Sequence, residues 1–139
     1  MKRGMLQVLR EYLPKIKEEE ERLDRKYAIR GQIIHIGDYP VDRMLEQNIH
    51  FFNLQRELLT YSLEELITFQ AVMYFGRDID PGEGAFKKTL ESQKSRNEDK
   101  KEIVKTILEK TAVLERYIKD ATWKLDSEGI NIEDLFIVK

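Results

Sequence analysis

Apolar residues recur three, four and seven positions apart along most of the chain, which is the spacing of one face of a helix. The first such pattern covers residues 2–27 and contains Pro14. An interior proline removes a backbone hydrogen bond and clashes with the preceding turn. We therefore expect a kink or break near Leu13, with Pro14 opening a second helix. Residues 1–29 are then an N-terminal helical arm.

Residues 30–39 have a different pattern, because β-branched residues lie between Gly31 and Gly37. This pattern predicts a short extended segment, and residues 135–138 have the same character. The two segments can pair as a minor two-stranded ribbon. Pro40 then marks the start of a helix with two apolar stripes. The first stripe is Val41, Leu45, Asn48, Phe52 and Leu59, and the second is Met44, Phe51 and Leu58.

The next helix is predicted to lie at the centre of the fold. Ser62 and Glu65 have the spacing of a capping box, in which each side chain satisfies a free backbone N–H group at the helix start. Residues 66–75 are apolar apart from a threonine and Gln70, and a helix that is apolar on nearly all sides is typical of a buried position. We expect this helix to end at Gly76, because glycine accepts the left-handed conformation that follows many helices.

Three more helical patterns follow towards the C-terminus. They begin near Gly84, Ile103 and Val113, and Thr111 can cap the last of them. Gly129 is a suitable stop for that helix. The predicted fold class is therefore all-α. We expect a multi-helix bundle of five to seven helices around one core, in a single domain of residues 1–139.

Composition narrows the range of functions. The chain has 139 residues, no cysteine, two histidines and a net charge of −2. Disulfides, thiolate chemistry and a multi-histidine metal site are excluded within one chain, and there is no global positive charge to hold nucleic acid. The apolar residues near the N-terminus are interrupted by polar ones, and no stretch approaches the ~18 apolar residues of a membrane span. We expect a cytoplasmic protein.

Sequence motifs for catalysis, cofactors or metals are incomplete. Asp78, Asp80 and Gly82 resemble the start of a calcium loop, but position twelve is Thr89 and lacks the required carboxylate. The glycines of this loop are not followed by the Gly-Lys-Ser/Thr ending of a phosphate-binding loop. Neither histidine lies in a nucleophile motif. We therefore predict no catalytic residue, no cofactor and no metal site, and we favour a binding protein over an enzyme.

Basic residues cluster in the segment 94–105, and the cluster has two interpretations. It consists of Lys94, Arg96, Lys100, Lys101 and Lys105. Acidic residues are interspersed and no aromatic residue is interleaved for base stacking, so a solvated, salt-bridged face is favoured over a nucleic-acid contact. Trp123 is expected to be a core anchor, with an interface hot spot as the alternative.

The string Met73-Tyr74-Phe75-Gly76-Arg77-Asp78 is the most distinctive in the chain. It closes an apolar helix and is followed by helices in the order seen in a small bacterial family of helical domains without assigned function, which this region resembles over about residues 61–133. The resemblance implies an all-helical bacterial domain and no activity. It draws attention to Arg77, which either binds the free carbonyls and carboxylates nearby or recognises a carboxylate or phosphate ligand.

The functional hypothesis is a non-catalytic interaction module that forms a homodimer or binds another protein. Broad apolar helix faces need more cover than one short chain supplies, and a two-fold pair is the commonest closed assembly. The alternative is a nucleic-acid-associated accessory protein that uses residues 94–105. The predicted dimer interface consists of Leu9, Tyr12, Ile16, Met44 and Phe51.

Overall fold

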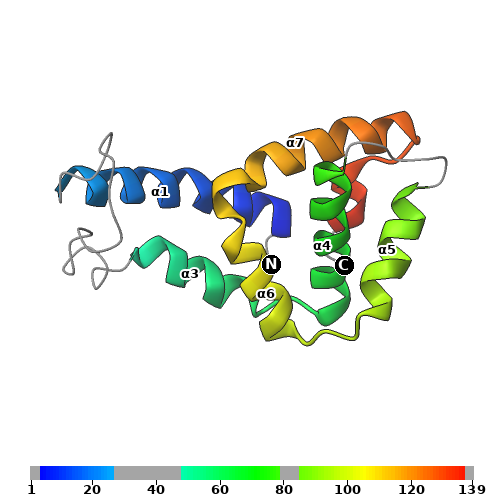
Figure 1. Cartoon of the computed structure of the whole chain (residues 1–139), viewed down its shortest axis with the longest axis horizontal. Helices are drawn as coiled ribbons and strands as arrows, with labels where there is room; N and C mark the ends of the chain where they lie inside the picture. The colour runs from blue at the N-terminus through cyan, green and yellow to red at the C-terminus, as the bar shows by residue number, and fades with distance from the viewer. Residues whose placement is uncertain (1–3, 27–47, 79–84, 137–139) are drawn as a thin grey trace, which may run out of the picture.

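The computed structural model describes residues 4–26, 48–78 and 85–136. These residues form an all-α bundle without strands, which confirms the predicted fold class (Figure 1). The elements are α1 (Met5–Lys26), α3 (Ile49–Leu58), α4 (Leu63–Arg77), α5 (Ala85–Ser95), α6 (Lys100–Glu109), α7 (Thr111–Ser127) and the 3₁₀ helix η1 (Ile132–Phe136).

Helix α4 is the central element, as its composition predicts. It packs against α7, α5 and α6, and one hydrophobic cluster joins its buried residues to those of every other described helix. Ser62 caps the start of α4 as expected, because the Glu65 backbone N–H donates a hydrogen bond to Ser62 Oγ at 3.1 Å, whereas no reciprocal bond to the Glu65 carboxylate is formed among the described residues. Figure 1 shows α5 running beside α4 while α7 passes across its end.

The predicted role of Gly76 is wrong. Helix α4 continues through this residue to Arg77, and Gly129 is the one glycine of the described ranges with positive φ. A Cβ atom on Gly76 would overlap the Tyr117 carbonyl oxygen and lie 3.1 Å from Ala121 Cβ. Gly76 is therefore needed because α7 approaches α4 so closely that no side chain fits between them.

The predicted break near Leu13, with Pro14 opening a second helix, is also wrong. Helix α1 is continuous from Met5 to Lys26 and carries Pro14 on its exposed face, where water can satisfy the carbonyl that proline leaves without a donor. The helix is not a free arm, since it packs against α3, α7 and η1 of its own chain. Leu9 and Ile16 are buried in these contacts and offer no surface to a second copy.

Helix α3 differs from its prediction in its start and in its buried face. The predicted start at Pro40 and the extended segment 30–39 lie outside the described residues. Asn48 is the N-cap, not part of an apolar stripe. Its Oδ1 accepts the His50 N–H, and its Nδ2 donates to the Ile16 carbonyl at 3.0 Å, which fastens α3 to α1. Phe52 is partly exposed, whereas Leu58 of the second predicted stripe is fully buried.

The C-terminal region corrects two further predictions. Thr111 is the first residue of α7, so α6 and α7 are divided where expected, but the capping position belongs to Lys110. Gly129 has φ +78° and follows α7 closely, as predicted. Leu135 and Phe136 belong to η1 and are not extended, so the ribbon predicted for residues 135–138 does not form at these two positions.

Candidate functional site

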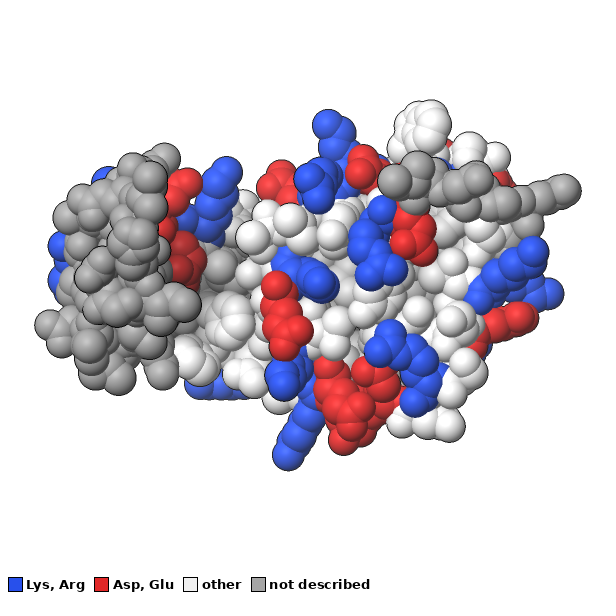
Figure 2. Space-filling model, viewed as in Figure 1, with Lys and Arg blue, Asp and Glu red and all other residues white. Residues whose placement is uncertain are grey.

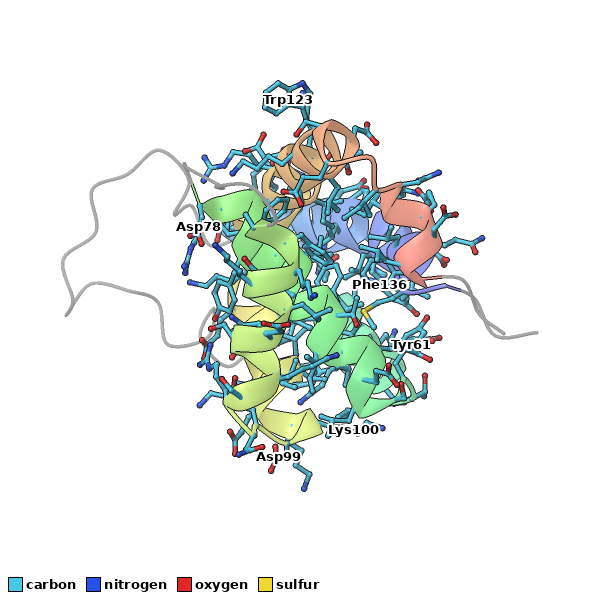
Figure 3. All side chains as sticks on the ribbon, turned by 90° about the vertical axis from the view of Figure 1, so that its right-hand side faces the viewer. Tyr61, Asp78, Asp99, Lys100, Trp123 and Phe136 are labelled. Carbon is cyan, nitrogen blue, oxygen red and sulfur yellow. The ribbon has the colours of Figure 1, made fainter. Side chains whose placement is uncertain are left out.

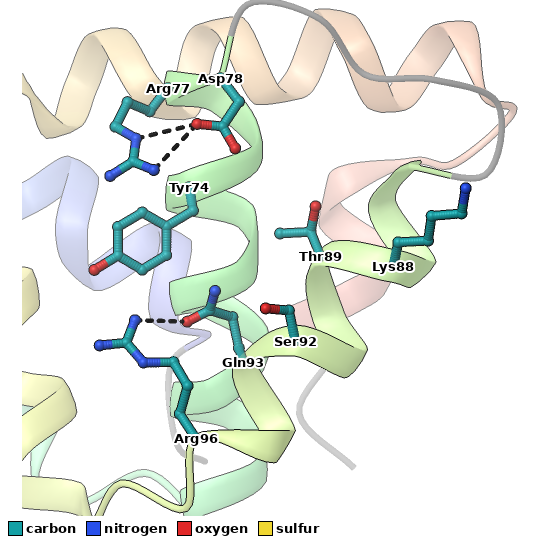
Figure 4. Close-up of a pocket in the computed structure, with 8 residues that line it drawn as sticks. All are labelled: Tyr74, Arg77, Asp78, Lys88, Thr89, Ser92, Gln93 and Arg96. Atoms are coloured by element: carbon teal, nitrogen blue, oxygen red, sulfur yellow. Dashed lines mark hydrogen bonds and ion pairs between the residues drawn. The ribbon is translucent and has the colours of Figure 1, made fainter.

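Two of the clefts that lie between described helices have volumes above about 400 Å³. The first, the Tyr74 cleft, lies between α4 and α5 and has a volume of about 430 Å³. It is mostly polar, and Asp78 is the one carboxylate among its described lining residues (Figure 4). Its lining consists of Tyr74, Arg77, Asp78, Lys88, Thr89, Ser92, Gln93 and Arg96.

Arg77 lies in this cleft, as a ligand-binding role requires. Its Nε and Nη2 donate to Asp78 Oδ1 at 3.2 and 3.1 Å, and its guanidinium carbon is 4.5 Å from the centre of the Tyr74 ring. Both interactions belong to the structural interpretation of Arg77, in which a carboxylate near the helix end holds the cation. They leave Nη1 without a hydrogen-bond partner among the described residues.

Arg96, which directly follows the end of α5, lies near the same Tyr74 ring. Its guanidinium carbon is 5.9 Å from the Tyr74 centroid, its Nε is 2.9 Å from Glu98 Oε1, and its Nη1 donates to Gln93 Oε1 at 3.3 Å. The same two acceptors receive hydrogen bonds from Gln70 Nε2, both at 3.1 Å. Gln70 is 1% exposed, so a buried amide in the central helix supports the position of Arg96.

The second cleft, the Trp123 cleft, lies between α1 and α7 and is mainly apolar, with a volume of about 570 Å³. Leu13 and Pro14 are supplied by α1, and the α7 residues recur at positions that place them on one helix face. Its lining consists of Arg10, Leu13, Pro14, Glu115, Ile118, Lys119, Thr122, Trp123 and Asp126.

Trp123 is not the core anchor that was expected. It is 75% exposed and projects outwards from α7 (Figure 3). The sequence contains a signal for this, because the buried stripe of α7 runs through Leu114, Ile118, Ala121 and Leu125 at spacings of four and three. Position 123 falls between members of that stripe and therefore on another face of the helix.

The basic residues of the segment 94–105 do not form one surface of single sign. Arg96 is paired with Glu98 at the Tyr74 cleft, apart from the lysines of α6. Lys101 and Lys105 are exposed one turn apart on α6, and Glu102 lies between them in sequence. Lys94 ends α5, and Lys100 begins α6. Figure 2 shows basic and acidic groups interspersed over the visible face.

The remaining predicted interface residues are only partly available. Tyr12 and Phe51 are half-buried against the core, and Met44 lies outside the described residues. The parts of the chain that the structure describes contain no group of three His, Asp or Glu side chains arranged to hold a metal ion. Asp80 and Gly82 of the calcium-like loop are not among the described residues.

No family profile, curated protein or solved structure matches this chain. The resemblance of residues 73–78 and the following helices to a bacterial helical family therefore stays a prediction. Among the described helices, none combines the length and the apolar character needed to cross a membrane.

Proposed function

We propose that the chain is a non-catalytic interaction module of the bacterial cytoplasm that associates with a second copy of itself through the Trp123 cleft. The observation that carries this proposal is the exposure of Trp123 beside an apolar cleft. Tryptophan is strongly enriched among the residues that dominate binding energy at protein interfaces, and it is costly to leave in water.

The shape of this surface favours a second copy as the occupant. The Trp123 ring, which projects from α7 (Figure 3), is itself part of the lining of the apolar cleft, so a protruding ring and a cleft adjoin on this surface. In a two-fold assembly the same patch meets itself, so each Trp123 ring can enter the hollow of the other copy. Leu13, Pro14 and Ile118 supply an apolar floor for the ring.

The charges around the cleft favour the same occupant. Arg10 and Lys119 are basic, whereas Glu115 and Asp126 are acidic. Two copies related by a two-fold axis present these same four charges to each other. Basic groups of one copy can then face acidic groups of the other. A strongly acidic or basic partner, such as nucleic acid, gains no net attraction here. The interspersed charges of residues 94–105 likewise give the nucleic-acid alternative little support.

Sedimentation velocity over micromolar concentrations tests this proposal. The wild-type chain is expected to approach twice the 16.6 kDa monomer mass as concentration rises. Removal of a central tryptophan costs about 2 kcal/mol or more, so Trp123→Ala should weaken the dimer by about thirtyfold or more. Leu63→Ala is the matched control, because Leu63 is also an exposed apolar residue but lies on α4 outside the cleft.

Two results contradict self-association through this face. A wild-type monomer at all concentrations overturns the proposed dimer and leaves the cleft to a different protein partner. A dimer that Trp123→Ala leaves intact overturns the assignment of the interface. Far-ultraviolet circular dichroism of each variant distinguishes a lost contact from a lost fold, because it reports the helices and not the substituted side chain.

A further inference from the structure

The Tyr74 cleft has features that packing does not require. Helix α4 is apolar where it is buried, except at Gln70, and a buried amide destabilises a helix core unless its hydrogen bonds are made. Here those bonds go to Gln93 and Glu98, the two groups that also hold Arg96. The buried amide therefore helps to fix the position of an exposed guanidinium. A residue that breaks a local packing rule in this way is typical of a functional position.

The two arginines are held in a similar manner on either side of one ring. Figure 4 shows the Arg77 guanidinium beyond one side of Tyr74 and the Arg96 guanidinium beyond the other. Each uses its Nε and one terminal nitrogen for protein contacts. The remaining nitrogens, Arg77 Nη1 and Arg96 Nη2, carry no hydrogen bond to the described residues. The cleft thus presents two separate, fixed donors for negatively charged oxygens.

The opposite wall of the cleft does not repel an anion. Helix α5 supplies the Ser92 hydroxyl group, which points towards α4, while Thr89 turns its methyl group towards α4 and Lys88 extends outwards from α5 (Figure 4). Thr89 donates its hydroxyl hydrogen to the Ala85 carbonyl at 2.9 Å. The single lining carboxylate, Asp78, is engaged with Arg77.

We propose that the Tyr74 cleft binds a small ligand with two linked phosphoryl groups, one at Arg77 and one at Arg96. Guanidinium groups bind phosphate oxygens through charge-assisted hydrogen bonds, which are stronger than neutral ones. Two donors on opposite sides of a ring suit two anionic groups better than one. This binding is separate from self-association through α1 and α7, and neither depends on the other.

Titration with inorganic pyrophosphate tests the proposal, followed by amide chemical shifts at constant ionic strength. Pyrophosphate should shift resonances around residues 74–78 and 88–96 and bind at least about tenfold more tightly than orthophosphate, because it can reach both donors. Arg77→Gln and Arg96→Gln should each weaken pyrophosphate binding by roughly ten- to a hundredfold, close to the affinity for orthophosphate. Lys101→Gln is the control, since it removes an exposed charge of α6 outside the cleft.

Gln70→Met tests the supporting role of the buried amide. The two side chains have similar length, so the fold should be retained while Arg96 loses part of its support. Pyrophosphate affinity should fall several-fold with an unchanged midpoint of urea unfolding. Equal affinity for orthophosphate and pyrophosphate overturns the proposal. So does a loss on Lys101→Gln as large as that on the arginine substitutions, because it means general attraction to positive charge.

Discussion

Helix α4 meets α7 along a seam of small and apolar groups, and it meets α5 along a seam that contains a buried amide. At the first seam, Gly76 brings the α4 backbone against the carbonyl of Tyr117, with Ala121 beside it. At the second, Gln70 donates hydrogen bonds to Gln93 and to Glu98. The close backbone contact tolerates no added atom, whereas the polar network can exchange partners.

The two seams also differ in how they are closed at the end of α4. From α7, Lys124 Nζ donates to the carbonyl of Phe75 at 3.0 Å and to the carbonyl of Asp78. From α5, Phe86 packs edge-on against Phe75, with ring centres 5.5 Å apart. The α7 side therefore satisfies the free carbonyls of α4 directly, as helix ends require. The α5 side adds apolar contact and leaves its polar groups near the surface, where a ligand can reach them.

The largest expected effect concerns the close contact at Gly76. In an open helix, Gly→Ala stabilises by roughly 1 kcal/mol. At Gly76 the new methyl group overlaps a backbone carbonyl, so α7 must move and core contacts are lost. We expect Gly76→Ala to lower the free energy of unfolding by about 3 kcal/mol or more, measured by urea unfolding.

Gly129→Ala is the control for this prediction. Nothing lies within 4 Å of an added Cβ there, but φ is +78°. The substitution should cost only about 1 kcal/mol, through backbone strain alone. If Gly76→Ala proves neutral or stabilising, the close approach of α4 and α7 is wrong.

Gly76 also shows where sequence reasoning about the fold stops. The apolar run before it correctly predicts a buried central helix, and Ser62 correctly predicts its start, because both signals are local. A glycine near the end of such a run has two explanations, a left-handed cap or a close helix contact. Which explanation applies depends on where Tyr117 lies in the fold. Tyr117 is forty-one positions away in the sequence, so no local pattern gives its position.

The clefts were predictable to different degrees. The family resemblance draws attention to Arg77, and its position near a helix end predicts what it can bind, but its placement opposite Arg96 across Tyr74 depends on how α5 returns along α4. Trp123 does not belong to the buried stripe of α7, so the helical spacing of the sequence is enough to predict that it is exposed. Leu9 and Ile16 are buried against their own chain. The α1 sequence alone does not predict this, because an apolar helix face can be covered equally well by other helices of the chain or by a second copy.

An intermediate effect on stability is expected for Lys124, because it satisfies the carbonyl groups at the end of α4 from the α7 side and, among the described residues, α5 supplies no such donor. Lys124→Met keeps the aliphatic stem and removes the hydrogen bonds to Phe75 and Asp78. We expect the free energy of unfolding to fall by about 1–2 kcal/mol, because helix-end carbonyls lose a charged donor. Lys105→Met, on the exposed side of α6, should change it by less than about 0.5 kcal/mol. An equal loss for both variants would mean that the cap contributes nothing specific.

The smallest effect on stability is expected at Gln70, and it separates the two seams most directly. Gln70→Met removes two hydrogen bonds but keeps a flexible side chain of similar length in the same buried space, which limits the loss. Gln93 and Glu98 keep Arg96 as a partner. We therefore expect the free energy of unfolding to change by less than about 1 kcal/mol, in contrast to the large loss at Gly76. Hydrogen exchange should become faster in α5 and stay unchanged in α7. A loss as large as that of Gly76→Ala would show that the amide network is needed to hold the core together, and the proposed division between a tight α7 seam and an adaptable α5 seam would then be wrong.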